Sequence, residues 1–553
     1  MSSSKPICSE ASETSARVIV PAAFRWQALS GANWRGYARG PGAHRLAAKI
    51  AAASGMDEVA ALLNEHPDFS GGILQGPGFV LAWADHIRSF PLYYAVKDGQ
   101  LYLSPDARAV QEGAGLETPD SVSALEFAMA GYATGKHTLY EGLYVLQPGE
   151  ILRWNGALKI ERYFHYTPEH RESPAEENMK KLGAVMDEIT QRIVDRAAGR
   201  PIWIPLSGGL DSRLILCRLH EYGYKNLHTF SYGPHFNFEA LCAKKIAARL
   251  GVPWQFVAPR QAWLRALFES NERRAFWRFA DGLKTVPCMR EFSAFMWLKK
   301  NRVIPDDAVV INGQSGDYIT GNHINAAWNA NGAGSAAQLF SIIRDKHYDL
   351  WKDLRTPRNE GIMRPRIAEL FPDGWEKFTS LHDLSRVEET WEYDGRQICY
   401  VLSGQRLYEF LGFEWELPLW ERTLVDFCRT LPFEQKFGQK LYKDWLRSWN
   451  YKGLFPAKEP YIWRWPLPML WVVPVAQLIG LVQGRKAKTR FYALMRYYGH
   501  YANQYAFFPR ATHKATAQNA RSVIALHVRQ WIDENQALFP ESLRRAAGVE
   551  SAD

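Results

Sequence analysis

The chain has 553 residues, a formal net charge of +9 and six cysteines. This length exceeds one ordinary hydrophobic core and favours two or three domains, so peptides, small disulfide scaffolds and simple binding modules are excluded. Hydrophobic residues at 47% and charged residues at 23% are typical of a globular protein. The basic excess favours anionic partners such as nucleotides, acidic sugars or a membrane surface, without choosing among them.

The cysteines include no CxxC pair, so neither a disulfide framework nor a zinc site is expected. The first twenty residues lack a basic start followed by a long apolar run, and we therefore expect no secretory signal. Both features predict a cytoplasmic protein with reduced thiols.

Short alternating apolar runs separated by Gly, Pro and Asp occupy residues 69–152, a pattern that predicts strands and hairpins. A helical stretch at residues 121–133 interrupts them. The polar, proline-bearing segment 167–178 is the expected linker. We therefore assign a first domain to residues 1–170.

Helical and strand patterns alternate beyond the linker. Residues 180–198 have the helical period, and strand, helix, strand, helix and strand patterns then follow in turn: 201–205, 211–223, 226–233, 237–251 and 308–317. Such alternation predicts a parallel sheet with right-handed crossovers. We assign the second domain to residues 175–470 and a helical extension to residues 471–553.

Residues 465–484 contain no charged side chain and are bounded by Arg464 and by the basic run 485–490. The stretch is about as long as a membrane span, but three prolines and Gly480 argue against a spanning helix, because lipid cannot replace the lost backbone donors. A buried core segment is the favoured interpretation. Peripheral membrane contact through residues 465–490 is the alternative.

The most specific motif is PLSGGLDSR at residues 205–213, between a predicted strand and a predicted helix. Two glycines let backbone N–H groups converge on an anion, the serines add donors, and the helix N-terminus adds the positive end of its dipole. No lysine follows the glycines, so this is not the P-loop of nucleoside triphosphatases. The motif predicts a phosphate-binding loop with Asp211 as a Mg²⁺ ligand.

The SGGLDS sequence resembles the pyrophosphate loop of ATP pyrophosphatases that adenylate a substrate, and further motifs resemble the asparagine synthetase family. INGQSGDYITGNH resembles its second glycine-rich loop, NFEALCAKKIAARLG its glutamate-led helix, and FEWELPLWERTLVDFCRTLP followed by KDWLR a later stretch. The hairpins WADHIRSFPLYYAVKDGQLYLSPDARAV and GEIL resemble its glutaminase domain. The likeness covers roughly residues 70 to 470.

This resemblance implies an α/β fold: an N-terminal αββα glutaminase-like sandwich of the Ntn type, then a doubly wound parallel-sheet ATP-pyrophosphatase domain with a helical C-terminal region. It implies ATP and Mg²⁺ as cofactors, and Asp211 and Asp317 as catalytic residues and metal ligands. Lys458 is the candidate catalytic lysine, with Arg464 as an alternative cation. The residues expected to bind ATP and pyrophosphate are Leu206, Ser207, Gly208, Gly209, Asp211, Ser212, Ser231, Gly233, Gly313, Ser315 and Gly316.

The chain departs from the family pattern in both halves. The family's glutaminase uses a cysteine exposed as residue 2, whereas this chain begins Met-Ser-Ser-Ser, so we expect a degenerate glutaminase-like domain. Nitrogen would then come from ammonia, a separate glutaminase or an amine on the substrate. Tyr318 replaces an acidic residue and Glu416 replaces an arginine, which predicts an acid other than aspartate.

Together these features predict an AMP-forming amide ligase that adenylates a carboxylate and transfers it to ammonia or an amine. Amidation of an acidic sugar in polysaccharide biosynthesis is the favoured role, on the inner face of the membrane or in the cytoplasm. The alternatives are ring closure to a macrolactam or β-lactam, asparagine synthesis, tRNA modification and a non-catalytic ATP-binding scaffold. We expect no nucleic-acid partner, and a homodimer stays open.

Overall fold

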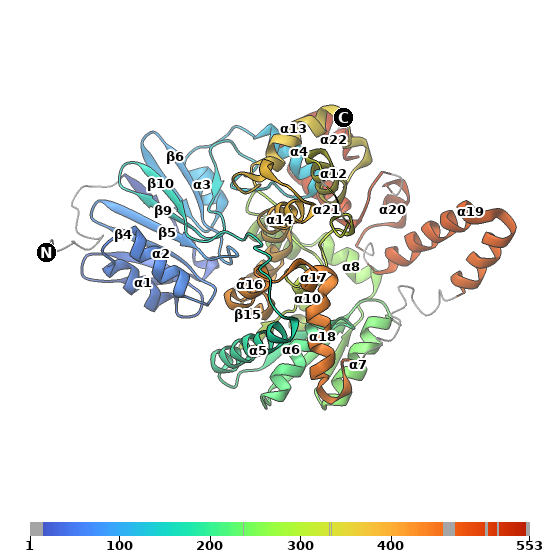
Figure 1. The fold of residues 1–553 in the computed structure, drawn as a ribbon. Helices are drawn as coiled ribbons and strands as arrows, with labels where there is room; N and C mark the ends of the chain where they lie inside the picture. Colours follow the sequence, from blue (N-terminus) through green and yellow to red (C-terminus); the bar gives the residue numbers. More distant parts are fainter. Residues whose placement is uncertain are drawn as a thin grey trace.

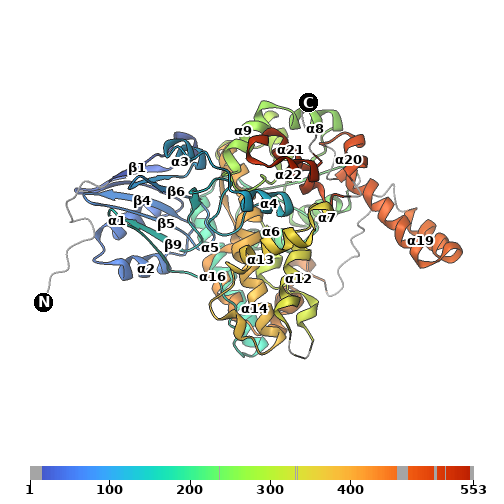
Figure 2. The same cartoon turned by 90° about the horizontal axis from the view of Figure 1, so that it is seen from above.

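The computed structural model describes residues 15–235, 237–330, 332, 334–456, 471–503, 507–516 and 519–548. A layered β-rich part, drawn in blue at the left of Figure 1, lies against a larger part that contains a second sheet and most of the helices. One helical element, α19 (Val472–Asn503), projects from the opposite side of this larger part (Figures 1 and 2).

The N-terminal part consists of two sheets. A mixed sheet has the strand order β1-β7-β6-β8, and an antiparallel sheet has the order β10-β9-β5-β4-β3-β2. The strands are β1 (Ala16–Val18), β2 (Gln27–Ser30), β3 (Arg35–Arg39), β4 (Gly71–Gly76), β5 (Phe79–Ala84), β6 (Tyr93–Lys97), β7 (Gln100–Ser104), β8 (Tyr144–Val145), β9 (Glu150–Trp154) and β10 (Leu158–Arg162).

Strand β5 shows how this part is layered. Its residues are all buried, and successive side chains enter different cores, as the two-residue period of a strand requires. Leu81 and Trp83 pack with α1 (Ala43–Ala52) and α2 (Met56–Glu65), whereas Val80 and Ala82 pack between the sheets. Helix α3 (Ala107–Gly113) covers the outer face of the smaller sheet. The predicted αββα sandwich is confirmed.

The second sheet has five parallel strands in the order β13-β12-β11-β14-β15. Helices α6 and α7 follow β11 and β12 and pack together, and the chain then returns past β11 to β14, so the direction of winding reverses between these two strands. The predicted doubly wound sheet is confirmed. The elements are β11 (Ile202–Pro205), α6 (Leu210–Glu221), β12 (Leu227–Tyr232), α7 (Phe238–Leu250), β13 (Trp254–Val257), β14 (Val309–Ile311) and β15 (Glu414–Glu416).

Helices cover the rest of the larger part, and one of them, near the C-terminus, packs on a helix from the first third of the chain. Helix α21 (Val523–Glu534) packs on α4 (Ser121–Ala130), with the rings of Trp531 and Phe127 4.7 Å apart. The others are α5 (Ala175–Ala197), α8 (Gln261–Phe268), α9 (Asn271–Ala280), α10 (Phe292–Lys300), α11 (Gly316–Ile319), α12 (Ala336–His347), α13 (Pro357–Ala368), α14 (Leu381–Glu392), a π-helical stretch (Tyr393–Val401), α15 (Arg406–Leu411), α16 (Arg422–Arg429), α17 (Phe433–Lys436), α18 (Lys440–Trp449), α20 (Arg510–Thr516) and α22 (Glu541–Ala546).

The expected linker is attached to the second part of the structure. Residues 167–174 have no regular secondary structure, and α5 begins at Ala175. The backbone N–H groups of Glu169 and Arg171 donate to the carbonyls of Arg429 and Thr430 at 2.7 and 3.0 Å. The segment is therefore fixed along the end of α16.

The interpretation of residues 465–484 as a core segment is wrong for the end of this segment, although Val472 and Ala476 are buried. Residues 465–470 lie outside the described residues, but Leu478, Leu481 and Val482 are 61%, 84% and 74% exposed. The physical reason is a break in α19 at Gly484 (φ 83°), which turns the chain back and places these side chains at the end of a hairpin whose two arms contact each other. None of the described helices is long and apolar enough to cross a membrane.

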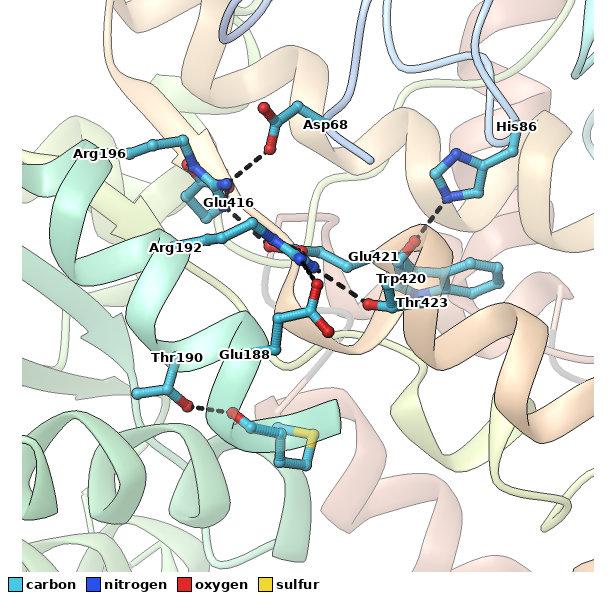
Figure 3. Close-up of polar contacts among 11 residues, drawn as sticks. Asp68, His86, Glu188, Thr190, Arg192, Arg196, Glu416, Trp420, Glu421 and Thr423 are labelled. Carbon is cyan, nitrogen blue, oxygen red and sulfur yellow. Dashed lines mark hydrogen bonds and ion pairs between the residues drawn. The ribbon is translucent and has the colours of Figure 1, made fainter. Parts of the chain in front are cut away.

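Arginines on α5 join the two parts of the molecule (Figure 3). Arg196 contacts Asp68 of the N-terminal part at 2.7 Å, Glu416 of β15 at 2.7 Å and Glu421 at 2.8 Å. Burial opposes the charge of Arg196, but Glu416 and Glu421 outweigh burial and raise its pKa. Arg192 lies one turn earlier and binds Glu421 as well. A single guanidinium thus bonds three carboxylates from three segments of the chain.

Removing this guanidinium should leave the buried Glu416 carboxylate without its partner. We expect Arg196→Leu to lower the free energy of unfolding by about 3–5 kcal/mol, the usual cost of breaking a buried ion pair. Arg196→Lys keeps the charge but loses the planar fork of donors. Its free energy of unfolding should therefore lie between those of the unsubstituted protein and Arg196→Leu. Urea unfolding of the three proteins measures these free energies.

Arg200 provides the matched control, because it is one turn further along and its partner Glu414 has a side chain that is 66% exposed. Arg200→Leu should cost less than about 1 kcal/mol. Equal losses for Arg196→Leu and Arg200→Leu would show that the Arg196 contacts do not hold the parts together.

Candidate active site

Two glycine-rich loops meet at the carboxyl edge of the parallel sheet. The first, residues 206–209, joins β11 to α6, and the second, residues 312–315, joins β14 to α11. Because β11 and β14 are neighbours, the loops touch: a Cβ on Gly313 would lie 2.9 Å from the Ser212 nitrogen, and one on Gly316 would lie 3.0 Å from the Asp211 carboxylate. Close approach therefore requires glycine at both positions.

The first loop is folded by its own serines. The Ser207 N–H donates to Ser212 Oγ and the Gly209 N–H donates to Ser207 Oγ, both at 3.1 Å. Gly209 is the N-cap of α6, and no side chain caps the helix. The positive end of the α6 dipole therefore stays available to an anion above the loop. Arg213 fixes the loop from below by donating to the Gly208 carbonyl at 2.7 Å.

Ser231 and Gly233 lie at the end of β12, beside the first loop. The Ser231 hydroxyl donates to the Leu206 carbonyl at 2.7 Å and accepts from Trp254 Nε1 at 2.9 Å. Gly233 has φ +128°, a backbone conformation that favours glycine. In this structure Ser231 shapes the first loop, and its hydroxyl is already occupied.

Asp211 and Asp317 are brought together by the meeting of the loops. Asp211 is the second residue of α6, where it accepts a hydrogen bond from the backbone of Asp317 and one from the Tyr442 hydroxyl at 2.9 Å. Burial and the Asp317 charge raise the pKa of Asp211 to about 7. Burial also opposes the charge of Asp317, but the hydrogen bond from His323 outweighs it and lowers that pKa. Burial thus favours a proton on Asp211, whereas His323 favours the ionised form of Asp317.

His323 connects this pair to a buried charge cluster on α14. Its Nε2 lies 3.3 Å from Asp317 and its Nδ1 2.5 Å from Glu392, which also binds Lys346 at 2.6 Å. Burial alone would lower the pKa of His323, but the bonds to Asp317 and Glu392 outweigh burial and raise it to about 9. His323 is thus a cation that orients Asp317.

The two departures from the family pattern have structural roles here. Tyr318 is buried, stacks on Trp420 with ring planes 10° apart, and donates to the Glu389 carbonyl at 2.6 Å. The Glu416 carboxylate is paired with Arg196, and burial raises its pKa to about 7. The charge of Glu416 is therefore met within the protein, at the junction with α5.

A contact chain links the N-terminal part to the second loop. His86 Nε2 donates to the Trp420 carbonyl at 2.8 Å, and Trp420 Nε1 donates to the Gln314 carbonyl at 2.9 Å (Figure 3 shows the first contact). Burial lowers the pKa of His86. Nε2 carries a proton in this contact, because a carbonyl oxygen only accepts. Trp420 thus connects the N-terminal part to the second loop.

Of the predicted site residues, the structure brings Asp211 and the first loop together with Asp317, Gly313, Ser315 and Gly316. Lys458 and Arg464 lie outside the described residues. Sequence reasoning missed Tyr442, Trp420 and Gln314, and gave His323 no definite role. Tyr442 directly precedes the KDWLR motif and Gln314 lies within the second loop motif, but nothing in the sequence indicated which side chain would contact a carboxylate.

The comparisons identify the domain that carries these loops. A family model described as asparagine synthase matches residues 186–457, which include both loops and both aspartates. Residues 186–457 form an asparagine synthase domain. The family consists of ATP-dependent amidating ligases, so the domain belongs among carbon–nitrogen ligases. No curated protein matches the chain at a significant level.

Two solved structures are similar to parts of the chain. Glutamine phosphoribosylpyrophosphate amidotransferase from B. subtilis, complexed with ADP and GMP, is 11% identical over 41% of this chain and 72% of that one, with a TM-score of 0.18. A structure titled as the allosteric regulatory enzyme of purine biosynthesis is 11% identical over 51% of this chain and 55% of that one, also with a TM-score of 0.18. Such low scores decide nothing about activity.

The raised pKa of His323 links stability to pH. Protonation of His323 stabilises the folded protein below about pH 6.5, and this contribution is lost as the pH rises toward 9. The loss should approach roughly 3 kcal/mol in the ligand-free protein. We expect His323→Asn to destabilise strongly at pH 6 and weakly above pH 9 in urea unfolding.

His44 on the exposed side of α1 gives the control variant. His44→Asn should change stability equally little at both pH values. A destabilisation by His323→Asn that does not vary with pH would contradict the ionic role of His323.

Proposed function

We propose that this protein is an AMP-forming amide ligase that adenylates a carboxylate and passes the acyl group to ammonia or an amine. The observation that carries this proposal is the pairing of Asp211 with Asp317 beside an uncapped helix N-terminus. A phosphate-binding loop alone would suit many nucleotide enzymes. Two carboxylates beside it, one of them half-exposed, favour a reaction in which pyrophosphate leaves as a complex with a divalent cation.

The donor set fits Mg²⁺. No group of three or more His, Cys, Asp or Glu side chains converges as a metal site among the described residues, so a cation at Asp211 and Asp317 would complete its shell with phosphate oxygens and water. The cation, when bound, neutralises charge on the leaving pyrophosphate. Its binding would also displace the proton that burial now favours on Asp211.

The chain's own residues perform the remaining tasks. Backbone N–H groups at the start of α6 donate to phosphate oxygens, and Ser207 and Ser212 hold the loop in the receptive shape. His323 keeps Asp317 ionised and oriented. The substrate carboxylate oxygen attacks the α-phosphorus, the bond to pyrophosphate breaks, and the resulting acyl-adenylate loses AMP when a nitrogen nucleophile attacks its carbonyl.

We further propose that the carboxylate belongs to an acidic sugar used in polysaccharide assembly and that the nitrogen is ammonia or a substrate amine. The pairing of Glu416 with Arg196 supports a substrate other than aspartate, because this position offers no free cation for a second carboxylate.

Pyrophosphate release with Mg·ATP, ammonium and a panel of carboxylates tests the substrate proposal. We expect release with nucleotide-linked uronic acids and at most one-tenth of that rate with aspartate. Faster release with aspartate would contradict the sugar assignment and leave the ligase chemistry in place. If ATP binds but no acid of the panel causes pyrophosphate release, the proposal that the protein adenylates such carboxylates is contradicted.

The two aspartates can be tested separately from the substrate. We expect Asp211→Asn and Asp317→Asn each to reduce pyrophosphate release by about 100-fold or more, because each removes a charged ligand while keeping the side-chain shape. Asp306→Asn is the control, since the Asp306 side chain is 93% exposed and lies before β14. Full activity in either active-site variant would exclude the two-aspartate site.

A further inference from the structure

Helix α19 is a hairpin that stands away from the rest of the molecule (Figures 1 and 2). The chain reverses at Gly484, where φ is 83° and ψ is 173°. The two arms hold each other: Lys488 Nζ donates to Gln477 Oε1 at 2.8 Å, and the rings of Trp471 and Phe491 lie 6.5 Å apart in an edge contact. Contacts between the two arms stabilise the hairpin, and its turn lies at the end that points away from the rest of the molecule.

The turn of this hairpin presents apolar side chains to solvent. Leu481 and Val482 are the most exposed large hydrophobic residues of the described chain, at 84% and 74%, and Leu478 and Trp471 follow at 61% and 51%. Burying such side chains is favourable, because it removes apolar surface from water. Adjacent apolar side chains that are exposed on a projecting element indicate an interaction surface.

Basic residues flank the apolar turn, and no acidic residue accompanies them in the sequence of this segment. Arg485, Lys486 and Arg490 follow within eight residues of Val482 and are all exposed. Over a longer stretch, residues 460–532 contain ten lysines and arginines and no aspartate or glutamate. The segment thus carries a formal +10, more than the +9 of the whole chain. The basic excess of this protein therefore resides in the region that contains the hairpin.

We propose that the α19 hairpin binds the surface of a bilayer that contains anionic lipids. The apolar turn would enter the boundary between headgroups and acyl chains, and the basic residues would meet the lipid phosphates, as in other interfacial helices. The arms do not cross the bilayer, since no described helix is long and apolar enough to do so. A purely electrostatic partner such as a nucleic acid would explain the charge but leave Leu481 and Val482 exposed.

Vesicle flotation with the full-length protein tests this proposal without any measurement of activity. We expect the protein to float with vesicles of phosphatidylcholine and phosphatidylglycerol, and at least tenfold less with phosphatidylcholine alone. Raising the salt concentration should weaken the binding, because salt screens the attraction to the lipid charges.

Paired substitutions separate the apolar and ionic contributions. Leu481→Ser with Val482→Ser should weaken binding at least tenfold, through loss of apolar burial. Arg485→Gln with Lys486→Gln should weaken it about 30-fold, from about fivefold for each basic residue near the lipid surface. All four positions are exposed, so circular dichroism and the unfolding midpoint should stay unchanged.

Matched pairs elsewhere on the surface are the controls. Val96→Ser with Leu158→Ser changes two exposed apolar residues of the N-terminal part, and Lys180→Gln with Lys181→Gln removes the same charge from α5. Both pairs should alter vesicle binding by less than about twofold.

Three results would overturn the proposal. The first is failure of the unsubstituted protein to float with phosphatidylglycerol vesicles. The second is an equal effect of the hairpin pairs and the control pairs. The third is sedimentation of the protein as a dimer that the Leu481→Ser and Val482→Ser pair converts to a monomer without any vesicle binding, which would assign the apolar turn to a second copy of the chain.

Discussion

The close approach of β11 and β14 is the constraint on which the proposed chemistry depends. A doubly wound sheet reverses its winding between two neighbouring strands, and the loops that leave them must diverge or touch. Here they touch, because glycines 313 and 316 let the second loop lie against the start of α6. Two carboxylates that would repel each other in solution are thereby held side by side. Their charges become tolerable through Tyr442 on one side and His323 on the other.

The N-terminal sandwich supports this arrangement from outside the sheet. Its contacts reach the second loop through Trp420 and the edge strand β15 through Arg196. Arg162 Nη2 also donates to both carboxylate oxygens of Asp394 in the π-helical stretch, at 2.8 and 2.7 Å. These are buried or half-buried contacts of defined geometry. The sandwich therefore stabilises the second loop and strand β15 of the asparagine synthase domain.

Local patterns in the sequence were enough to predict the elements that carry the site. The alternation of apolar residues predicted β4 to β7, and glycine-punctuated strand and helix runs predicted β11 to α7 with errors of one or two residues at their ends. Strand β15 escaped detection because three residues, Glu414 to Glu416, with a charge at each end do not resemble a buried strand. Glu416 is tolerated there only because α5 places Arg196 beside it, and such a long-range pairing leaves no local signal. The exposure of α19 was unpredictable for a similar reason, since an apolar run is the same in sequence whether it is covered or not.

The packing of α21 on α4 has a consequence for how the protein folds during translation. The ring of Phe127 is covered by Trp531 and Phe539, which are made much later than Phe127. While the ribosome is still translating, α4 lacks this cover and its apolar face is open to water or to chaperones. The two ends of the chain are thus interdependent in assembly. A truncation that stopped short of α21 would damage the packing of the N-terminal third as well as the C-terminal region that it removes.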